Sequence, residues 1–187
     1  RQRDVTYVKI HTNHGITGIS EVFGVGPDQA TVVWVDYYAE RLIGQDPDAV
    51  EWVWELLYRG TRYRPGSSGM AALSAIDLAL WDIKGRSVAL PVYKLLGGSV
   101  KDKVPVYLNI RWDKPDEEQH LIVEQALTEG YKFFKTAPLP SDWRELHWGD
   151  ALDAGRKQLQ ALRELVGNSI EIGLDAHAQQ FEPWRAI

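Results

Sequence analysis

Strand-like and helix-like segments alternate through the second half of the chain, and this alternation restricts the possible folds more than any other feature. Strands that are separated by a helix run parallel and are joined by right-handed crossovers. The sequence therefore predicts a parallel sheet of α/β architecture from Lys103 onward. We expect strands at Val104–Ile110, Lys132–Ala137 and Ile170–His177, and helices at Asp116–Thr128 and Ala151–Val166, with a further helix that begins at Phe181.

Three strands are too few for a closed parallel barrel, which has eight strands and about 250 residues. The third strand–helix unit is also incomplete, because few residues follow Phe181. We therefore expect the 187 residues to be a truncated part of a longer fold.

The first hundred residues lack this alternation and predict a separate α+β domain. Strand patterns at Val5–His11 and Ile16–Val22 flank the turn residues Asn13-His14-Gly15, which is typical of a β-hairpin. Helical periodicity follows at residues 29–43 and 48–59. We predict a domain boundary at residue 100, which separates domains at residues 1–100 and 101–187.

A third helix of the first domain is the strongest in the chain. We expect Ser67-Ser68 to cap it and Gly85 to end it. Almost every position in Met70–Ile83 is small or apolar, which is typical of a helix buried on most sides, as between two domains. Asp77 and Asp82 interrupt this pattern, and we interpret them as hydrogen-bonding groups rather than catalysts.

Composition excludes several classes of partner and site. The net charge is −5 and there is no basic tract, so we expect no nucleic-acid partner. The sequence has no cysteine, which excludes disulfides, thiolate metal sites and a cysteine nucleophile. Its apolar stretches are too short to cross a membrane, so we expect a cytoplasmic protein without a membrane partner.

A carboxylate and an imidazole, Asp175 and His177, lie two residues apart at the end of the third predicted strand. Side chains alternate along a strand, so we expect both to point the same way. A carboxylate is a hard metal ligand, and an imidazole exchanges a proton near neutral pH. In a parallel barrel the C-terminal ends of the strands are where such groups act. For an isolated pair of this kind, a loop aspartate and a surface histidine remain the alternative.

Two segments of the first domain carry a resemblance to a known family. They are Met70-Ala-Ala-Leu-Ser-Ala-Ile-Asp-Leu-Ala-Leu-Trp-Asp-Ile-Lys-Gly85, followed by Pro91-Val-Tyr-Lys-Leu-Leu-Gly-Gly98, and the earlier Gly15-Ile-Thr-Gly-Ile-Ser-Glu21. With the order of elements, they resemble the enolase superfamily in its mandelate racemase/muconate lactonizing enzyme branch. The resemblance implies an α+β capping domain followed by the first three βα units of a TIM-type (β/α) barrel.

The resemblance also implies roles for particular residues. Asp175 falls on the position of the first of three carboxylate ligands for Mg²⁺, and His177 matches the Asp-x-His arrangement of galactonate-type and mannonate-type dehydratases. The second barrel strand ends in Lys135-Thr136-Ala137, where racemases and lactonizing enzymes have Lys-x-Lys. Lys135 is then a catalytic cation that steadies the substrate carboxylate, His177 is the catalytic acid or base, and Lys132 on the opposite face lies in solvent.

The function that this resemblance implies is a Mg²⁺-dependent lyase that dehydrates a sugar acid through an enediolate. Two alternatives stay open: a racemase, epimerase or cycloisomerase of the same superfamily, and a non-catalytic relative. The absence of the second lysine, at Ala137, counts against the first alternative. We expect a small-molecule acid-sugar substrate and a homo-oligomer. Four residues on the strand-to-helix loops are in a position to contact substrate, but we prefer to interpret them as loop residues without that role: Arg111, Trp112, His147 and Trp148.

Overall fold

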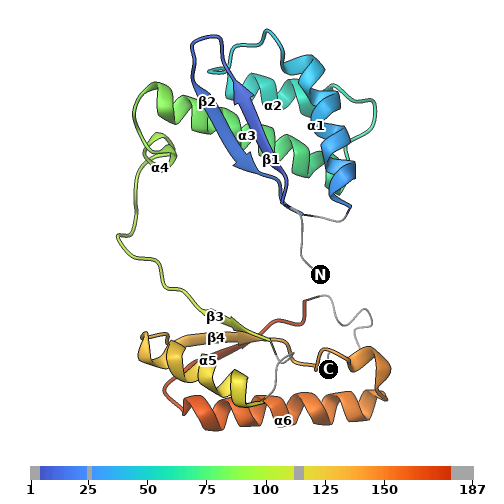
Figure 1. Cartoon of the computed structure of the whole chain (residues 1–187), viewed down its shortest axis with the longest axis vertical. Coiled ribbons are helices and arrows are strands. Elements are labelled where there is room, and N and C mark those ends of the chain that lie inside the picture. The colour runs from blue at the N-terminus through green and yellow to red at the C-terminus, as the bar shows by residue number, and fades with distance from the viewer. Residues whose placement is uncertain (1–4, 25–26, 112–115, 178–187) are drawn as a thin grey trace. The chain divides into compact units, whose positions relative to one another are not determined.

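A computed structural model of the chain describes residues 5–24, 27–111 and 116–177. The chain divides into two compact units, at residues 1–102 and 103–187 (Figure 1). The first unit contains a β-hairpin and four helices among these residues, and the second contains a parallel sheet. No helix in the described part of the chain is long and apolar enough to cross a membrane.

The predicted hairpin is present in the first unit. Strands β1 (Tyr7–His11) and β2 (Thr17–Glu21) pair antiparallel, from Tyr7 opposite Glu21 to His11 opposite Thr17. Gly15 takes a φ of +80° in the turn between them, a conformation that glycine adopts without steric cost. The hairpin therefore forms where the sequence predicts it, with strands slightly shorter than expected.

Three helices complete the core of this unit: α1 (Asp28–Leu42), α2 (Val50–Arg59) and α3 (Ser67–Ser87). Helix α3 lies at the centre, because the hairpin packs against it together with α1 and α2 (Figure 1). The short helix α4 (Val92–Leu95) follows. The apolar helix is thus confirmed, but the elements that bury it all belong to the first unit, so a position between two domains is not needed to explain its composition.

The ends of α3 differ from the prediction. Ser67 is its first residue, Gly66 occupies the cap position, and no side chain caps the helix, so the expected serine cap is wrong. The helix also continues two residues past Gly85, to Ser87. Its contact with β2 depends on Gly18, where a Cβ atom would overlap the carbonyl oxygen of Ala79.

The second unit contains the predicted parallel sheet. Strands β3 (Leu108–Ile110), β4 (Phe133–Thr136) and β5 (Glu171–Leu174) pair in chain order. The crossover helices are α5 (Asp116–Thr128) and α6 (Trp148–Val166), with a short 3₁₀ turn η1 (Trp143–Glu145) before α6. Both helices cover one face of the sheet (Figure 1). The core of that face consists of Ile110, Val123, Ala126, Phe134, Leu162, Val166 and Ile170.

Several boundaries in this unit differ from the predicted ones. We expected the first strand to begin at Val104, but Val104 and Val106 are 75% and 65% exposed. The reason is that β4 begins at Phe133, so the residues before Tyr107 extend past its end and pair with no strand in the described part of the chain. Helix α6 begins at Trp148 instead of Ala151. The predicted helix at Phe181 lies outside the described residues.

Candidate active site

Lys135 is placed by the alternation of side chains along β4. Phe134 and Thr136 are fully buried against the helices, so Phe133 and Lys135 occupy the other face of the sheet. Lys132 is exposed, as predicted. The strands on either side place Asn109 and Gly173 directly opposite Lys135.

Lys135 forms an ion pair with Asp175, so these two predicted site residues lie together. Its Nζ donates to Oδ2 of Asp175 over 2.8 Å, and the two side chains are 26% and 34% exposed. The ammonium also lies 5.3 Å from the centre of the Tyr107 ring, within the range of a cation–π contact. The hydrogen bond to Asp175 raises the pKa of Lys135, and the same bond lowers the pKa of Asp175.

His177 approaches Asp175 through a turn and not through strand alternation. Strand β5 ends at Leu174, because its neighbour β4 ends at Thr136, so the prediction of a strand to His177 is wrong. His177 has a φ of +43°, which is uncommon for a residue other than glycine. Its backbone N–H donates to Oδ1 of Asp175 over 3.0 Å, and its Nδ1 lies 3.4 Å from Oδ2. Asp175 and His177 are therefore close together, as predicted, but a turn and not strand alternation brings them together.

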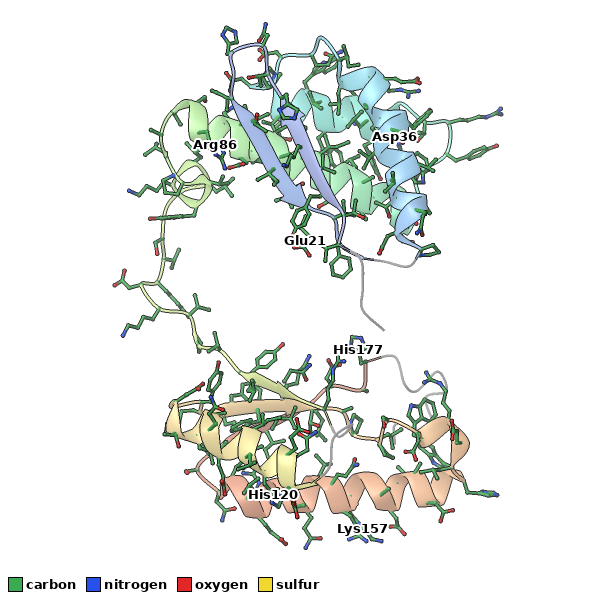
Figure 2. The ribbon with its side chains drawn as sticks, in the orientation of Figure 1. Glu21, Asp36, Arg86, His120, Lys157 and His177 are labelled. Atoms are coloured by element: carbon green, nitrogen blue, oxygen red, sulfur yellow. The ribbon has the colours of Figure 1, made fainter. Side chains whose placement is uncertain are left out.

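These three side chains share a cavity of about 340 Å³ at the C-terminal ends of the strands. The ring of His177 is 87% exposed and lies on the side of the unit away from Lys157 of α6 (Figure 2). A carboxylate, an ammonium group and an imidazole therefore border one space that is open to solvent. The cavity is lined by Asn109, Ile110, Arg111, Lys135, Thr136, Ala137, Leu139, Ser141, Asp175 and His177.

Sequence reasoning missed or dismissed some residues that line this cavity or support its lining. Arg111 was interpreted as a loop residue, yet it lines the cavity at the end of β3. Gln119 of α5 is only 2% exposed, and its side-chain amide donates to the carbonyl oxygen of Arg111. Asn109 could have been found, because it is the polar residue of an otherwise apolar strand that pairs with Lys135. Gln119 gave no signal, since it lies between the charged or polar residues Glu118 and His120.

The other residues that the sequence singled out lie elsewhere. His147 precedes α6 as an exposed residue, and Trp148 begins that helix. Trp112 lies outside the described residues. Asp82 is a hydrogen-bonding group, as predicted, because its Oδ2 accepts from the backbone N–H of Ile19 over 3.0 Å and from Arg86 Nε over 2.9 Å.

The chemistry of Asp175 fits a place in a Mg²⁺ site. Mg²⁺ prefers oxygen ligands and is commonly held by one or two carboxylates together with substrate oxygens and water. Asp175 supplies one partly exposed carboxylate that faces the cavity. Within residues 5–24, 27–111 and 116–177, no group of three or more His, Asp or Glu side chains converges to form a complete metal cage. Of the ligands of such a site, the described residues can therefore supply one, the Asp175 carboxylate.

Comparison with known proteins decides the family. Residues 1–97 match the family model described as the mandelate racemase / muconate lactonizing enzyme N-terminal domain. The chain belongs to this family. Within it, the chain is 38% identical over 182 residues to the D-galactonate dehydratase of Pectobacterium atrosepticum, covering 97% of this chain and 47% of the relative. It is 34% identical to the D-galactonate dehydratase of Xanthomonas euvesicatoria, covering 95% and 46%.

Solved structures with a similar fold agree with this assignment. A crystal structure of an enolase from Agrobacterium radiobacter, a candidate galactarate dehydratase bound to Na and L-malate, superposes with a TM-score of 0.85 at 37% identity. The match covers 97% of this chain and 46% of that one. A candidate dehydratase from Mesorhizobium loti matches with a TM-score of 0.80 at 33% identity, over 92% and 49%. The chain therefore spans about half the length of the family members that it matches.

Proposed function

We propose that this chain carries part of the active site of a Mg²⁺-dependent lyase that dehydrates a sugar acid. The observation that carries the proposal is the shared cavity of Lys135, Asp175 and His177 at the C-terminal ends of parallel strands. The relatives named D-galactonate dehydratase support a sugar acid as the substrate class. We also propose that residues 101–187 are the first three βα units of a barrel, and that residues 1–100 are its capping domain.

The reaction transfers the proton on the carbon next to a carboxylate to a base of the full-length protein and then expels the hydroxyl of the neighbouring carbon. In this proposal the departing hydroxyl takes a proton from His177 and leaves as water, and the resulting enol becomes a 2-oxo-3-deoxy acid. An imidazole suits this step because it can donate and accept a proton near neutral pH. Lys135 binds the substrate carboxylate and stabilises the negative charge of the enediolate. Bound Mg²⁺, with Asp175 as one ligand, would add further charge stabilisation.

Arg111 extends the proposal to substrate binding. It lines the same cavity as Lys135, and a guanidinium matches a carboxylate or paired hydroxyl groups through its fixed fork of donors. Gln119 fixes the backbone from which Arg111 projects, because its buried amide bonds to the Arg111 carbonyl. We therefore include Arg111 among the residues that orient the acid sugar and treat Gln119 as its positioning residue.

A racemase, epimerase or cycloisomerase remains the second candidate, and Ala137 argues against it. This residue lines the cavity two positions after Lys135, but a methyl side chain cannot carry a proton. Proton transfer on that side of the substrate would need a group from another part of the protein. Loss of a hydroxyl, in contrast, needs an acid such as His177.

The test is an assay of the full-length protein with galactonate and galactarate, with Mg²⁺ and after metal removal, that measures formation of the 2-oxo-3-deoxy acid. We expect His177→Asn to abolish product formation while Mg²⁺ affinity changes little. His147→Asn is the matched control, because His147 is exposed and does not line the cavity. Product formation by His177→Asn at the parental rate would refute the role of His177.

Exchange of the substrate α-proton with solvent separates the two proton transfers. If another residue removes the α-proton, His177→Asn should still catalyse exchange in deuterated water while it fails to expel the hydroxyl. If His177 is itself the α-base, exchange and dehydration should vanish together. The exchange rate is measured by NMR of recovered substrate, with the parental protein and His147→Asn as references.

A further inference from the structure

We propose that Lys135 is the built-in counter-cation of Asp175 in the metal-free protein, and that a divalent cation must displace its ammonium group to bind. The inference rests on one part of the proposed function, the role of Asp175 as a metal ligand. It goes beyond the proposed function because Lys135 then determines both the metal affinity of the protein and its stability without metal. The ammonium group of Lys135 then has two positions: on the Asp175 carboxylate without metal, and away from that carboxylate when metal is bound.

Both oxygens of the Asp175 carboxylate already accept hydrogen bonds. Oδ2 accepts from Lys135 Nζ over 2.8 Å, and Oδ1 accepts from the backbone N–H of His177 over 3.0 Å. The bond to His177 is fixed by the backbone turn, whereas the bond to Lys135 comes from a flexible side chain. Oδ2 is therefore the oxygen that can exchange its partner. Lys135 Nζ at 2.8 Å, which is closer to Oδ2 than His177 Nδ1 at 3.4 Å, is the partner that leaves.

A divalent cation and the ammonium cannot share Oδ2 without strong repulsion. Mg²⁺ binds carboxylate oxygens at about 2.0–2.1 Å, so an ammonium still 2.8 Å from the same oxygen would lie within a few ångströms of the metal. Like charges at that separation repel by an amount that partial burial increases. The free energy of metal binding must therefore include the cost of separating the Lys135 ammonium from the Asp175 carboxylate.

The surroundings allow the ammonium to move while the backbone stays in place. The backbone of Lys135 is held on both sides, by pairing with Asn109 of β3 and Gly173 of β5. Its four-carbon stem can turn instead, and the Tyr107 ring already lies 5.3 Å from Nζ on the same face. A cation over that ring keeps a favourable contact after it leaves the carboxylate. The displaced ammonium also stays within the cavity, where an acid substrate would meet it.

The test measures Mg²⁺ and Mn²⁺ binding to the metal-free full-length protein by calorimetry. Lys135→Met should tighten the Kd for each ion by about tenfold, the scale of losing one like charge near a partly buried ligand. Lys135→Arg keeps the charge and should bind about as weakly as the parent. Lys132→Met is the matched control, because it removes the same charge from an exposed position just before β4 and should leave the Kd unchanged.

Thermal unfolding gives a second readout with the opposite sign. Without metal, Lys135→Met should have a lower Tm than the parent, because Asp175 has lost its counter-cation. Saturating Mg²⁺ should raise the Tm of Lys135→Met more than that of the parent. Weaker or unchanged metal binding by Lys135→Met overturns the proposal, as does an equal tightening by Lys132→Met.

One further variant separates this inference from the proposed function. Asp175→Asn should weaken metal binding in the Lys135→Met background, and if it does not, the assignment of Asp175 as a ligand fails and the displacement fails with it. If the variants follow the expected affinities but no sugar acid is dehydrated, the proposed function fails while the displacement stands. Absence of binding in the parent and in Lys135→Met overturns both.

Discussion

The central helix of the first unit gives the most direct test of how this fold is stabilised. Leu80 lies in the middle of α3 and is only 3% exposed, while Leu78 on the same helix is 52% exposed. Replacing each by alanine removes the same atoms from the same helix. The difference between the two variants therefore reports burial, because helix propensity changes equally in both.

The structure sets the expected magnitude. Leu→Ala removes three carbon atoms, and at about 0.8 kcal/mol each their transfer from the core to water costs about 2.4 kcal/mol. Any cavity that remains adds to this cost, so measured values reach about 5 kcal/mol. Leu80 borders a hollow of about 520 Å³ between the hairpin and the end of α1. Neighbouring groups or water can enter the vacated space from there, so we expect about 2–3.5 kcal/mol.

Urea unfolding monitored by tryptophan fluorescence and by circular dichroism is the appropriate assay. Leu80→Ala should lower the free energy of unfolding by this amount with little change in the m-value. Leu78→Ala should lower it by less than about 1 kcal/mol, since half of the side chain is already in solvent. Equal losses in the two variants, or a loss below about 1 kcal/mol for Leu80→Ala, would refute the assignment of α3 as the centre of the core.

Two other positions give predictions with internal controls. Gly155 of α6 packs so closely on the loop after β4 that a Cβ atom would overlap the carbonyl oxygen of Pro138, so Gly155→Ala should cost about 1–3 kcal/mol in urea unfolding. Gly149 of the same helix has open space at that position, and Gly149→Ala should be neutral or slightly stabilising; a loss equal to that of Gly155→Ala would contradict the packing. Burial, and then repulsion by Glu51, raises the pKa of Asp77 above 3.8, so the native state disfavours the charged form and stability falls as pH rises through that raised pKa. Asp77→Asn should therefore raise Tm at pH 7 and give no such gain at pH 3, and an equal gain at both values would show that the charge is not the cause.

Helices were predicted best, because their periodicity is a local property of the sequence. Helix α5 begins at Asp116 and ends at Thr128, as predicted, and α1 and α2 differ from their predicted ranges by one or two residues. Strand ends were predicted less well. Both β3 and β5 are shorter than their apolar patterns, since a strand continues only as far as its neighbour does. That limit depends on β4, which is distant in sequence from both.

The candidate site likewise combines residues that the sequence predicts with contacts that it does not predict. Lys135 and Asp175 could be found from residue type and position, because each lies at or just after the end of an apolar strand. The turn that brings His177 to Asp175 could not, since a positive φ at a histidine has no signal in the sequence. The bond from Gln119 to the Arg111 carbonyl also depends on how α5 packs against the sheet.

The described contacts hold the three site residues to different degrees, and this predicts how their variants combine. Lys135 lies inside β4, and Asp175 is tied to the same strand because its N–H donates to the Thr136 carbonyl oxygen over 2.9 Å. Among the described residues, His177 is held by the Asp175 carboxylate. Asp175→Ala should therefore misplace the imidazole as well as remove the proposed metal ligand, whereas His177→Asn should leave Asp175 where it is.

The losses of activity caused by Asp175→Ala and by His177→Asn should consequently not be additive. If Asp175→Ala already displaces the imidazole, adding His177→Asn should reduce kcat/KM for the proposed dehydration little further, because groups that act as a unit are strongly non-additive. The measurement is a double-mutant cycle on kcat/KM with the same sugar acid. Losses that multiply independently would show that something other than the Asp175 carboxylate positions His177, and the hydrogen bond from its N–H would then be incidental to catalysis.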